Sequence, residues 1–220
     1  MRDDITNIKI EDYMARLMPP RPDALASLEA RGRKEGLPLV GPVQGTLLYL
    51  LAKSIGAREA LEIGVATGYA ASWILAAIAP GGGRLTAIEQ QPKRIAMARE
   101  VTAAAGYGDA FVIHEGEWFT ELEMLPGPYD LIFLDILRHL SDAGDAPRAL
   151  DVCVPKMRPG GLLIADNVLC NALVLDDDAA PTVAGIQAFN RKIMNHPELE
   201  SVILPLRDGV AICRKRETTE

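Results

Sequence analysis

Short apolar runs alternate with longer segments of mixed polarity through the centre of the chain. The apolar runs are residues 60–63, 84–88, 110–113, 131–134 and 162–165. The intervening segments of helix length are residues 69–79, 92–105, 118–124 and 141–157. Strands that are apolar on both faces are typical of a parallel sheet covered by helices on both sides. The pattern therefore predicts a series of strand–helix units.

The pattern changes toward the C-terminus. Two apolar runs, 202–206 and 210–213, flank the turn signal Asp208-Gly209, which is typical of an antiparallel hairpin. The expected fold is therefore α/β, with a doubly wound, Rossmann-like sheet. Its seven strands are mostly parallel with an antiparallel C-terminal hairpin, and helices cover both faces.

Two helices are expected before this core. Residues 8–17 have a mostly helical apolar spacing that a proline pair then ends, and a second helix is expected over 22–36. A chain of 220 residues is long enough for one α/β core and too short for two of ordinary size. We therefore expect a single domain, with 1–40 as an N-terminal helical extension and 41–216 as the core.

The composition excludes several classes of protein. Hydrophobic residues make up 49% and charged residues 24% of the sequence, which is typical of a packed globular protein. The net charge of −7 disfavours nucleic acid, because phosphate binding needs a concentrated Lys/Arg surface.

The N-terminus lacks the apolar stretch of a secretory signal, and the longest apolar run is far short of the roughly 20 residues of a membrane span. We expect a cytoplasmic protein with a small-molecule substrate and no membrane partner.

The cysteines do not indicate a metal or redox site. Cys153, Cys170 and Cys213 are odd in number and widely spaced, and no CxxC pair occurs. Free cysteines pack like small hydrophobic residues, so we expect buried thiols.

The first strand–helix turn carries the clearest binding signal. Gly64 and Gly68 allow the backbone to approach a ligand closely, and Glu89, at the end of the next strand, can accept both hydroxyls of a ribose. A nicotinamide site is disfavoured, because Ala66 replaces the second glycine of its Gly-x-Gly-x-x-Gly turn. Glu62 would repel a pyrophosphate and favour a cationic amino-acid ligand. The alternative is a plain tight turn with Glu62 as a surface acid.

Several motifs together resemble one known family. In chain order they are LEIGVATGYAA, AIEQ, FLDILR, LLIADNVL and LPLRDGVAICRK. They resemble the catechol and caffeoyl-CoA O-methyltransferase family of class I methyltransferases, from about Gly41 to Arg216. The resemblance implies an S-adenosylmethionine-dependent O-methyltransferase that acts on a small catechol-like or phenol-like hydroxyl. It also implies a homodimer.

The resemblance further implies which residues bind S-adenosylmethionine. Gly64 and the backbone near Val40 would hold its methionine part, Glu89 its ribose, and the segment 116–118 its adenine. Trp118 could instead be a core aromatic residue. The full set of expected cofactor residues is Val40, Glu62, Gly64, Gly68, Tyr69, Glu89, Gly116, Glu117, Trp118 and Asp135.

A metal site is expected at the ends of two later strands. Asp135 follows the fourth strand, and Asp166 and Asn167 end the fifth. Their oxygens suit Mg²⁺, or also Mn²⁺ or Ca²⁺, and such a cation would lower the pKa of a hydroxyl that it binds. The alternative is that Asp166-Asn167 forms a turn and that Asp135 caps a helix.

One position departs from the family. The family usually carries a lysine as general base three residues after the first metal aspartate, and this chain has Arg138. A guanidinium stays protonated, so it could stabilise a phenolate without acting as a base. The neighbouring His139 has a suitable intrinsic pKa, although a surface position is an open alternative. The candidate catalytic residues are Asp135, Arg138 and His139.

The substitution also leaves other functions open. The protein could be a non-catalytic S-adenosylmethionine-binding module, or a metal-independent methyltransferase. Near the site, Ile136 and Leu137 suggest an apolar wall, and the loop 171–182 has the length of a lid. Its acidic run 176–178 is either solvated or favours a basic substrate.

Overall fold

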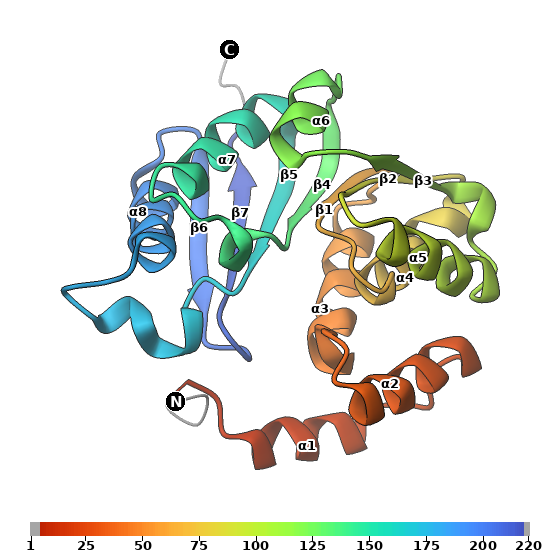
Figure 1. The fold of residues 1–220 in the computed structure, drawn as a ribbon. Helices are drawn as coiled ribbons and strands as arrows, with labels where there is room; N and C mark the ends of the chain where they lie inside the picture. Colours follow the sequence, from red (N-terminus) through yellow and green to blue (C-terminus); the bar gives the residue numbers. More distant parts are fainter. Residues whose placement is uncertain (1–4, 218–220) are drawn as a thin grey trace. The chain divides into compact units, whose positions relative to one another are not determined.

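A computed structural model describes residues 5–217 (Figure 1). The chain divides into two compact units. The first, called here the N-terminal unit, is Tyr13–Glu121. The second, called the C-terminal unit, combines the described residues up to Asp12 with those from Leu122 onward. The helices α1 (Ile8–Leu17) and α6 (Trp118–Met124) each contain a boundary between the units.

The N-terminal unit consists of strand–helix repeats that follow two helices. Its elements are α2 (Asp23–Glu35), α3 (Gly41–Ser54), β1 (Glu59–Ile63), α4 (Tyr69–Ile78), β2 (Arg84–Glu89), α5 (Pro92–Ala104) and β3 (Phe111–Glu115). The strands lie in the order β3-β2-β1, and both pairs are parallel. The carboxyl ends of these strands therefore lie at one edge of the sheet, where loops can form a binding site.

The C-terminal unit contains the rest of the strands. Its elements are β4 (Tyr129–Leu134), α7 (Asp145–Cys153), β5 (Met157–Asp166), α8 (Pro181–Asn195), β6 (Leu199–Leu204) and β7 (Val210–Lys215). The strands lie in the order β4-β5-β7-β6; β4 and β5 are parallel, whereas β7 is antiparallel to both β5 and β6. The expected C-terminal hairpin is confirmed.

The fold class is also confirmed, as a seven-stranded, mostly parallel sheet with helices around it. The apolar runs are buried as their composition predicted: Leu61 and Ile63 in β1 and residues 131–134 in β4 have no exposed surface. Burying one such aliphatic side chain stabilises a fold by about 1.5–3 kcal/mol, so these strands form the core.

Two helices differ from the prediction. The helix expected over 141–157 is shorter, because α7 ends at Cys153 and Met157 already pairs with Tyr129 as the first residue of β5. Pro155 lies in the short 3₁₀ turn between them, where a proline cannot continue an α-helix. Helix α3 was not predicted, because its apolar residues are spread around the helix and give no amphipathic stripe.

The three cysteines are buried free thiols, as expected. Burial raises the pKa of Cys153 to about 12 and that of Cys213 to about 11. Burial also raises the pKa of Cys170. Because the thiolate is the reactive form, these thiols are inert at neutral pH.

Among residues 5–217, no helix has both the length and the apolar composition needed to span a membrane.

Helix α1 has no buried residue. Its apolar side chains Ile8, Ile10, Tyr13 and Leu17 are 46%, 53%, 54% and 68% exposed. An amphipathic helix of this kind gains stability only when its apolar face packs against another surface.

Candidate functional site

The turn between β1 and α4 has an unusual backbone. Gly64, Ala66 and Gly68 have φ angles of 90°, 48° and 79°, all in the left-handed region. A Cβ atom at Gly68 would lie 2.8 Å from the Cα of Ala98, so only glycine fits between the turn and α5. The N–H groups of Gly64 and Gly68 donate to the backbone oxygens of Ile88 and Val65, both at 3.0 Å, so the turn is tight and fixed at the edge of the sheet.

The carboxylate of Glu89 holds this turn in place. Glu89 is the last residue of β2 and is 1% exposed. One carboxylate oxygen accepts the backbone N–H of Ala66 at 3.1 Å, and the other accepts those of Gln90 and Gln91 at 2.9 and 3.0 Å. A carboxylate with two oxygens has acceptor capacity beyond these bonds. Glu89 is thus a fixed anionic acceptor beside the glycine turn, where the ribose was expected.

Two other expected cofactor residues lie on either side of this turn. Glu62, in β1, is 1% exposed and is therefore not a surface acid. Tyr69, the first residue of α4, donates its hydroxyl hydrogen to Oε1 of the buried Glu29 at 2.8 Å. Burial raises the pKa of this phenol, so it stays neutral. Contact with a cofactor would accordingly come from the backbone or ring of Tyr69.

The segment 116–118 follows β3 at the same edge. The N–H of Gly116 donates to the backbone oxygen of Glu89 at 3.2 Å. The carboxylate of Glu117 accepts the N–H and hydroxyl of Thr120 at 2.8 and 3.0 Å, and so caps α6. Trp118 is half-buried. Val40 is buried at the N-terminus of α3. All the expected cofactor residues except Asp135 therefore lie in the N-terminal unit.

The expected metal ligands lie in the C-terminal unit. Leu134 pairs with Ala165 in the parallel ladder between β4 and β5, so Asp135 and Asp166 are the next residues on neighbouring strands. Such strands lie about 4.8 Å apart. Asn167 follows Asp166 and has a left-handed φ of 63°. The register therefore brings two carboxylates and an amide to one edge of the sheet.

This donor set fits a hard divalent cation. Carboxylate and amide oxygens are the ligands that Mg²⁺, Mn²⁺ and Ca²⁺ take. The alternative of Asp135 as a helix cap is not observed, because Ile136 precedes the 3₁₀ turn Leu137–His139. Within the described residues, no three or more His, Cys, Asp or Glu side chains form a metal-binding group. The expected set has only two carboxylates, and the cation remains a prediction.

Arg138 is engaged in an ion pair. Its Nη1 lies 3.2 Å from Oδ2 of Asp208, a residue that is 2% exposed. With the amide of Asn171 turned so that its oxygen faces the guanidinium, that oxygen accepts hydrogen bonds from Nη2 and Nη1 at 3.0 and 3.1 Å. His139 is exposed on the same 3₁₀ turn. Arg138 thus joins the turn after β4 to the connection between β6 and β7.

Three residues of these networks were missed by the sequence analysis. Glu29 was given no role, and Asn171 and Asp208 were placed only in a loop and a turn, yet Glu29 and Asp208 are buried. Asp208 lies 70 residues from Arg138 in the chain. The only available signal was the Asp-Gly turn at the C-terminal hairpin, which predicts a turn and not a buried carboxylate.

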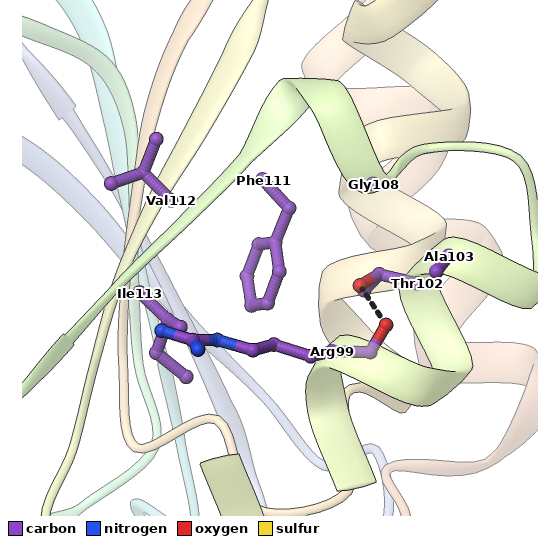
Figure 2. A pocket seen from close by; sticks show the side chains of 7 residues that line it. All are labelled: Arg99, Thr102, Ala103, Gly108, Phe111, Val112 and Ile113. Carbon is purple, nitrogen blue, oxygen red and sulfur yellow. Dashed lines mark hydrogen bonds between the residues drawn. The ribbon is translucent and has the colours of Figure 1, made fainter. Parts of the chain in front are cut away.

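A cavity of about 420 Å³ lies elsewhere in the N-terminal unit (Figure 2). It is lined by Arg99, Thr102 and Ala103 of α5, by Gly108, and by Phe111, Val112 and Ile113 of β3. None of these is an expected site residue. The hydroxyl of Thr102 donates to the backbone oxygens of Ala98 and Arg99 at 2.8 and 3.3 Å, so it is already satisfied. The cavity does not belong to the cofactor turn.

The chain is similar to known proteins along most of its length. A family model described as O-methyltransferase matches residues 24–216. A catechol O-methyltransferase of Niastella koreensis is 31% identical over 215 residues, covering 92% of this chain and 95% of that protein. A catechol O-methyltransferase of Mycobacterium tuberculosis is 31% identical over 185 residues, covering 82% of this chain and 81% of that protein. The solved O-methyltransferase of Bacillus cereus, in complex with SAH, is 26% identical with a TM-score of 0.83, covering 98% and 100% of the two chains.

Proposed function

Because this chain belongs to the O-methyltransferase family and uses S-adenosylmethionine as its methyl donor, we propose that its acceptor is a small catechol-like diol held by a divalent cation. The observation that carries this proposal is the register of β4 and β5, which sets Asp135 and Asp166 side by side. Carboxylate oxygens are ligands that a hard divalent cation prefers. The catechol O-methyltransferases among the relatives support the acceptor class.

Each unit has a separate task in the proposed reaction. In the N-terminal unit, Glu89 accepts hydrogen bonds from the ribose hydroxyls, while the turn 64–68 binds the methionine part through its backbone. In the C-terminal unit, Asp135, Asp166 and Asn167 would hold the cation. When bound, the cation supplies a positive charge that lowers the pKa of a coordinated hydroxyl.

The chemical step is a displacement at carbon. The acceptor oxygen, after loss of its proton, attacks the methyl group of the sulfonium, and the carbon–sulfur bond breaks as the carbon–oxygen bond forms. The products are the methyl ether, S-adenosylhomocysteine and one proton. Positioning the two reactants accounts for most of the acceleration in a reaction of this type. The guanidinium of Arg138 cannot take the proton, because it stays protonated, so His139 or water must do so.

Turnover with a panel of catechols and monophenols tests the proposal. The protein is first treated with EDTA, and the rate is measured with and without added Mg²⁺. We expect methylation of vicinal diols only when Mg²⁺ is present. Full activity after EDTA treatment would contradict the cation, and the enzyme would then be a metal-independent methyltransferase. A preference for monophenols would contradict the diol.

A further inference from the structure

The segment that follows β5 is strained. Asn167, Cys170, Asn171 and Ala172 have φ angles of 63°, 47°, 52° and 65°. Each is a non-glycine residue in the left-handed region, where the Cβ of an L-residue is sterically strained. Four such residues within one short segment persist only if the surrounding structure fixes them. The contacts of this segment therefore show what holds it.

The connection between β6 and β7 supplies most of these contacts. The N–H of Val168 donates to the backbone oxygen of Gly209 at 3.2 Å, and the N–H of Leu169 to that of Asp208 at 2.9 Å. Gly209 has a φ of 86°, and a Cβ atom there would lie 2.8 Å from the backbone nitrogen of Leu169. From α8, the side-chain amide of Asn190 donates to the oxygen of Val168 at 2.7 Å.

The carboxylate of Asp208 completes the arrangement. Its Oδ1 accepts the backbone N–H of Asn171, and its Oδ2 pairs with Nη1 of Arg138 at 3.2 Å. Asp208 is 2% exposed, so its charge needs this partner in order to remain buried. The carboxylate of Asp208 thus binds the strained backbone directly. It is held in turn by Arg138, which occupies the position of the family lysine.

We propose that Asp208 and Arg138 are positioning residues for the cation and the acceptor. They fix the segment 167–172, called here the strained segment. Asn167 thereby stays in position to bind the same cation as Asp166. This role rests on the proposed function. It gives Arg138 a task other than proton transfer, and predicts that loss of the pair weakens cation and acceptor binding while cofactor binding is unchanged.

The first test measures the strained segment without any reaction. Arg138→Gln removes the charge from a side chain that is 42% exposed and keeps an amide that can donate to Asp208, so the variant should fold. We expect amide hydrogen exchange at residues 168–172 to become about 10-fold faster or more, because hydrogen bonds to a charged group are weakened. Glu123→Gln, which breaks the exposed pair between Arg148 and Glu123, is the matched control and should leave this exchange unchanged. Unchanged exchange in Arg138→Gln would overturn the proposal.

The second test measures binding. We expect Arg138→Gln to weaken Mn²⁺ binding by about 10-fold, as is typical when a supporting partner of a metal ligand is lost. The KM for the catechol should rise, whereas the KM for S-adenosylmethionine should not change. Arg138→Lys should restore much of the Mn²⁺ affinity, because it restores the charge beside Asp208. An equal loss of cofactor and acceptor binding would show a merely structural role and overturn the proposal.

These readouts separate the proposal from the proposed function. If the wild type binds S-adenosylmethionine and Mn²⁺ but methylates no catechol, the acceptor class is wrong, while hydrogen exchange and Mn²⁺ binding still test Asp208 and Arg138. Asp208→Asn is the direct variant of the buried residue and should show the same changes. If Asp208→Asn does not fold, the Arg138 variants decide the outcome.

Discussion

The carboxylate of Glu89 accepts the backbone N–H of Ala66 at 3.1 Å, across the turn between β1 and α4. This bond explains how alanine occupies a position with a left-handed φ of 48°. That conformation costs an L-residue about 1–2 kcal/mol. A nicotinamide enzyme places glycine there to leave room for phosphates. Here the N–H of Ala66 at this position is hydrogen-bonded to Glu89, the residue expected to bind the ribose.

Replacement of Glu89 should therefore weaken cofactor binding. We expect Glu89→Gln to reduce the affinity for S-adenosylmethionine by about 1.5–3 kcal/mol, because a charged acceptor is lost. Isothermal titration calorimetry measures the change. Glu115→Gln is a suitable control, since Glu115 pairs with Glu89 in the ladder between β2 and β3 but is exposed. Equal affinities in the two variants would show that Glu89 does not bind the ribose.

Asp166 should be essential for turnover and dispensable for the cofactor. We expect Asp166→Ala to abolish methyl transfer and Mg²⁺ dependence, because a carboxylate ligand is lost. Binding of S-adenosylmethionine should stay near the wild-type value, since the expected cofactor residues other than Asp135 lie outside the C-terminal unit. Residual activity that still responds to Mg²⁺ would place the cation elsewhere.

His139 provides a test of the proton acceptor. It is exposed, and no other imidazole lies on its 3₁₀ turn. If the proton leaves to water, His139→Ala should retain appreciable activity and the same dependence of kcat on pH. If the variant loses most of its activity and the limb of the pH profile near the intrinsic pKa of histidine, about 6.5, then the imidazole is the base.

Stability should fall at alkaline pH. Burial raises the pKa of Cys153 to about 12 and that of Cys213 to about 11, whereas an unfolded thiol ionises near pH ~8.5. Their contribution to stability is therefore complete below about pH 8.5 and is lost as the pH rises toward the folded pKa values. Urea unfolding between pH 7 and 10 measures this, and Cys213→Ser should reduce the dependence. Rapid reaction of native protein with a thiol reagent at pH 8 would contradict the burial.

We predict that the expected homodimer forms through the exposed apolar face of α1. Tyr13 and Leu17 are 54% and 68% exposed, and a second copy of the chain could cover them. Light scattering at micromolar concentration should give twice the chain mass, and Leu17→Glu should shift the mass toward one chain. Arg16→Glu, a change of charge at the exposed neighbouring residue, is the control. A wild-type monomer would reject the dimer.

The sequence predicted the parts of the fold that depend on local pattern. Apolar runs located every strand, because buried strands have a simple composition. The start of β5 was placed too late, since Met157-Arg-Pro-Gly resembles a loop and only its pairing with Tyr129 makes it a strand. The pair between Arg138 and Asp208 could not be predicted, because it joins residues 70 positions apart. Local pattern carries no information on such pairings.

Helix α2 matters for any attempt to recombine this enzyme with its relatives. The Tyr69 hydroxyl donates a hydrogen bond to Glu29, and Glu29 forms an ion pair with Arg21 at 2.7 Å. These two interactions tie α2 to the first residue of α4. A chimera joined after residue 36 would leave the phenol of Tyr69 buried without its acceptor, directly beside the glycine turn. A junction placed before Arg21 keeps both interactions. Exchange of N-terminal segments should therefore be designed around Arg21, so that the Tyr69 hydroxyl beside the glycine turn keeps its acceptor.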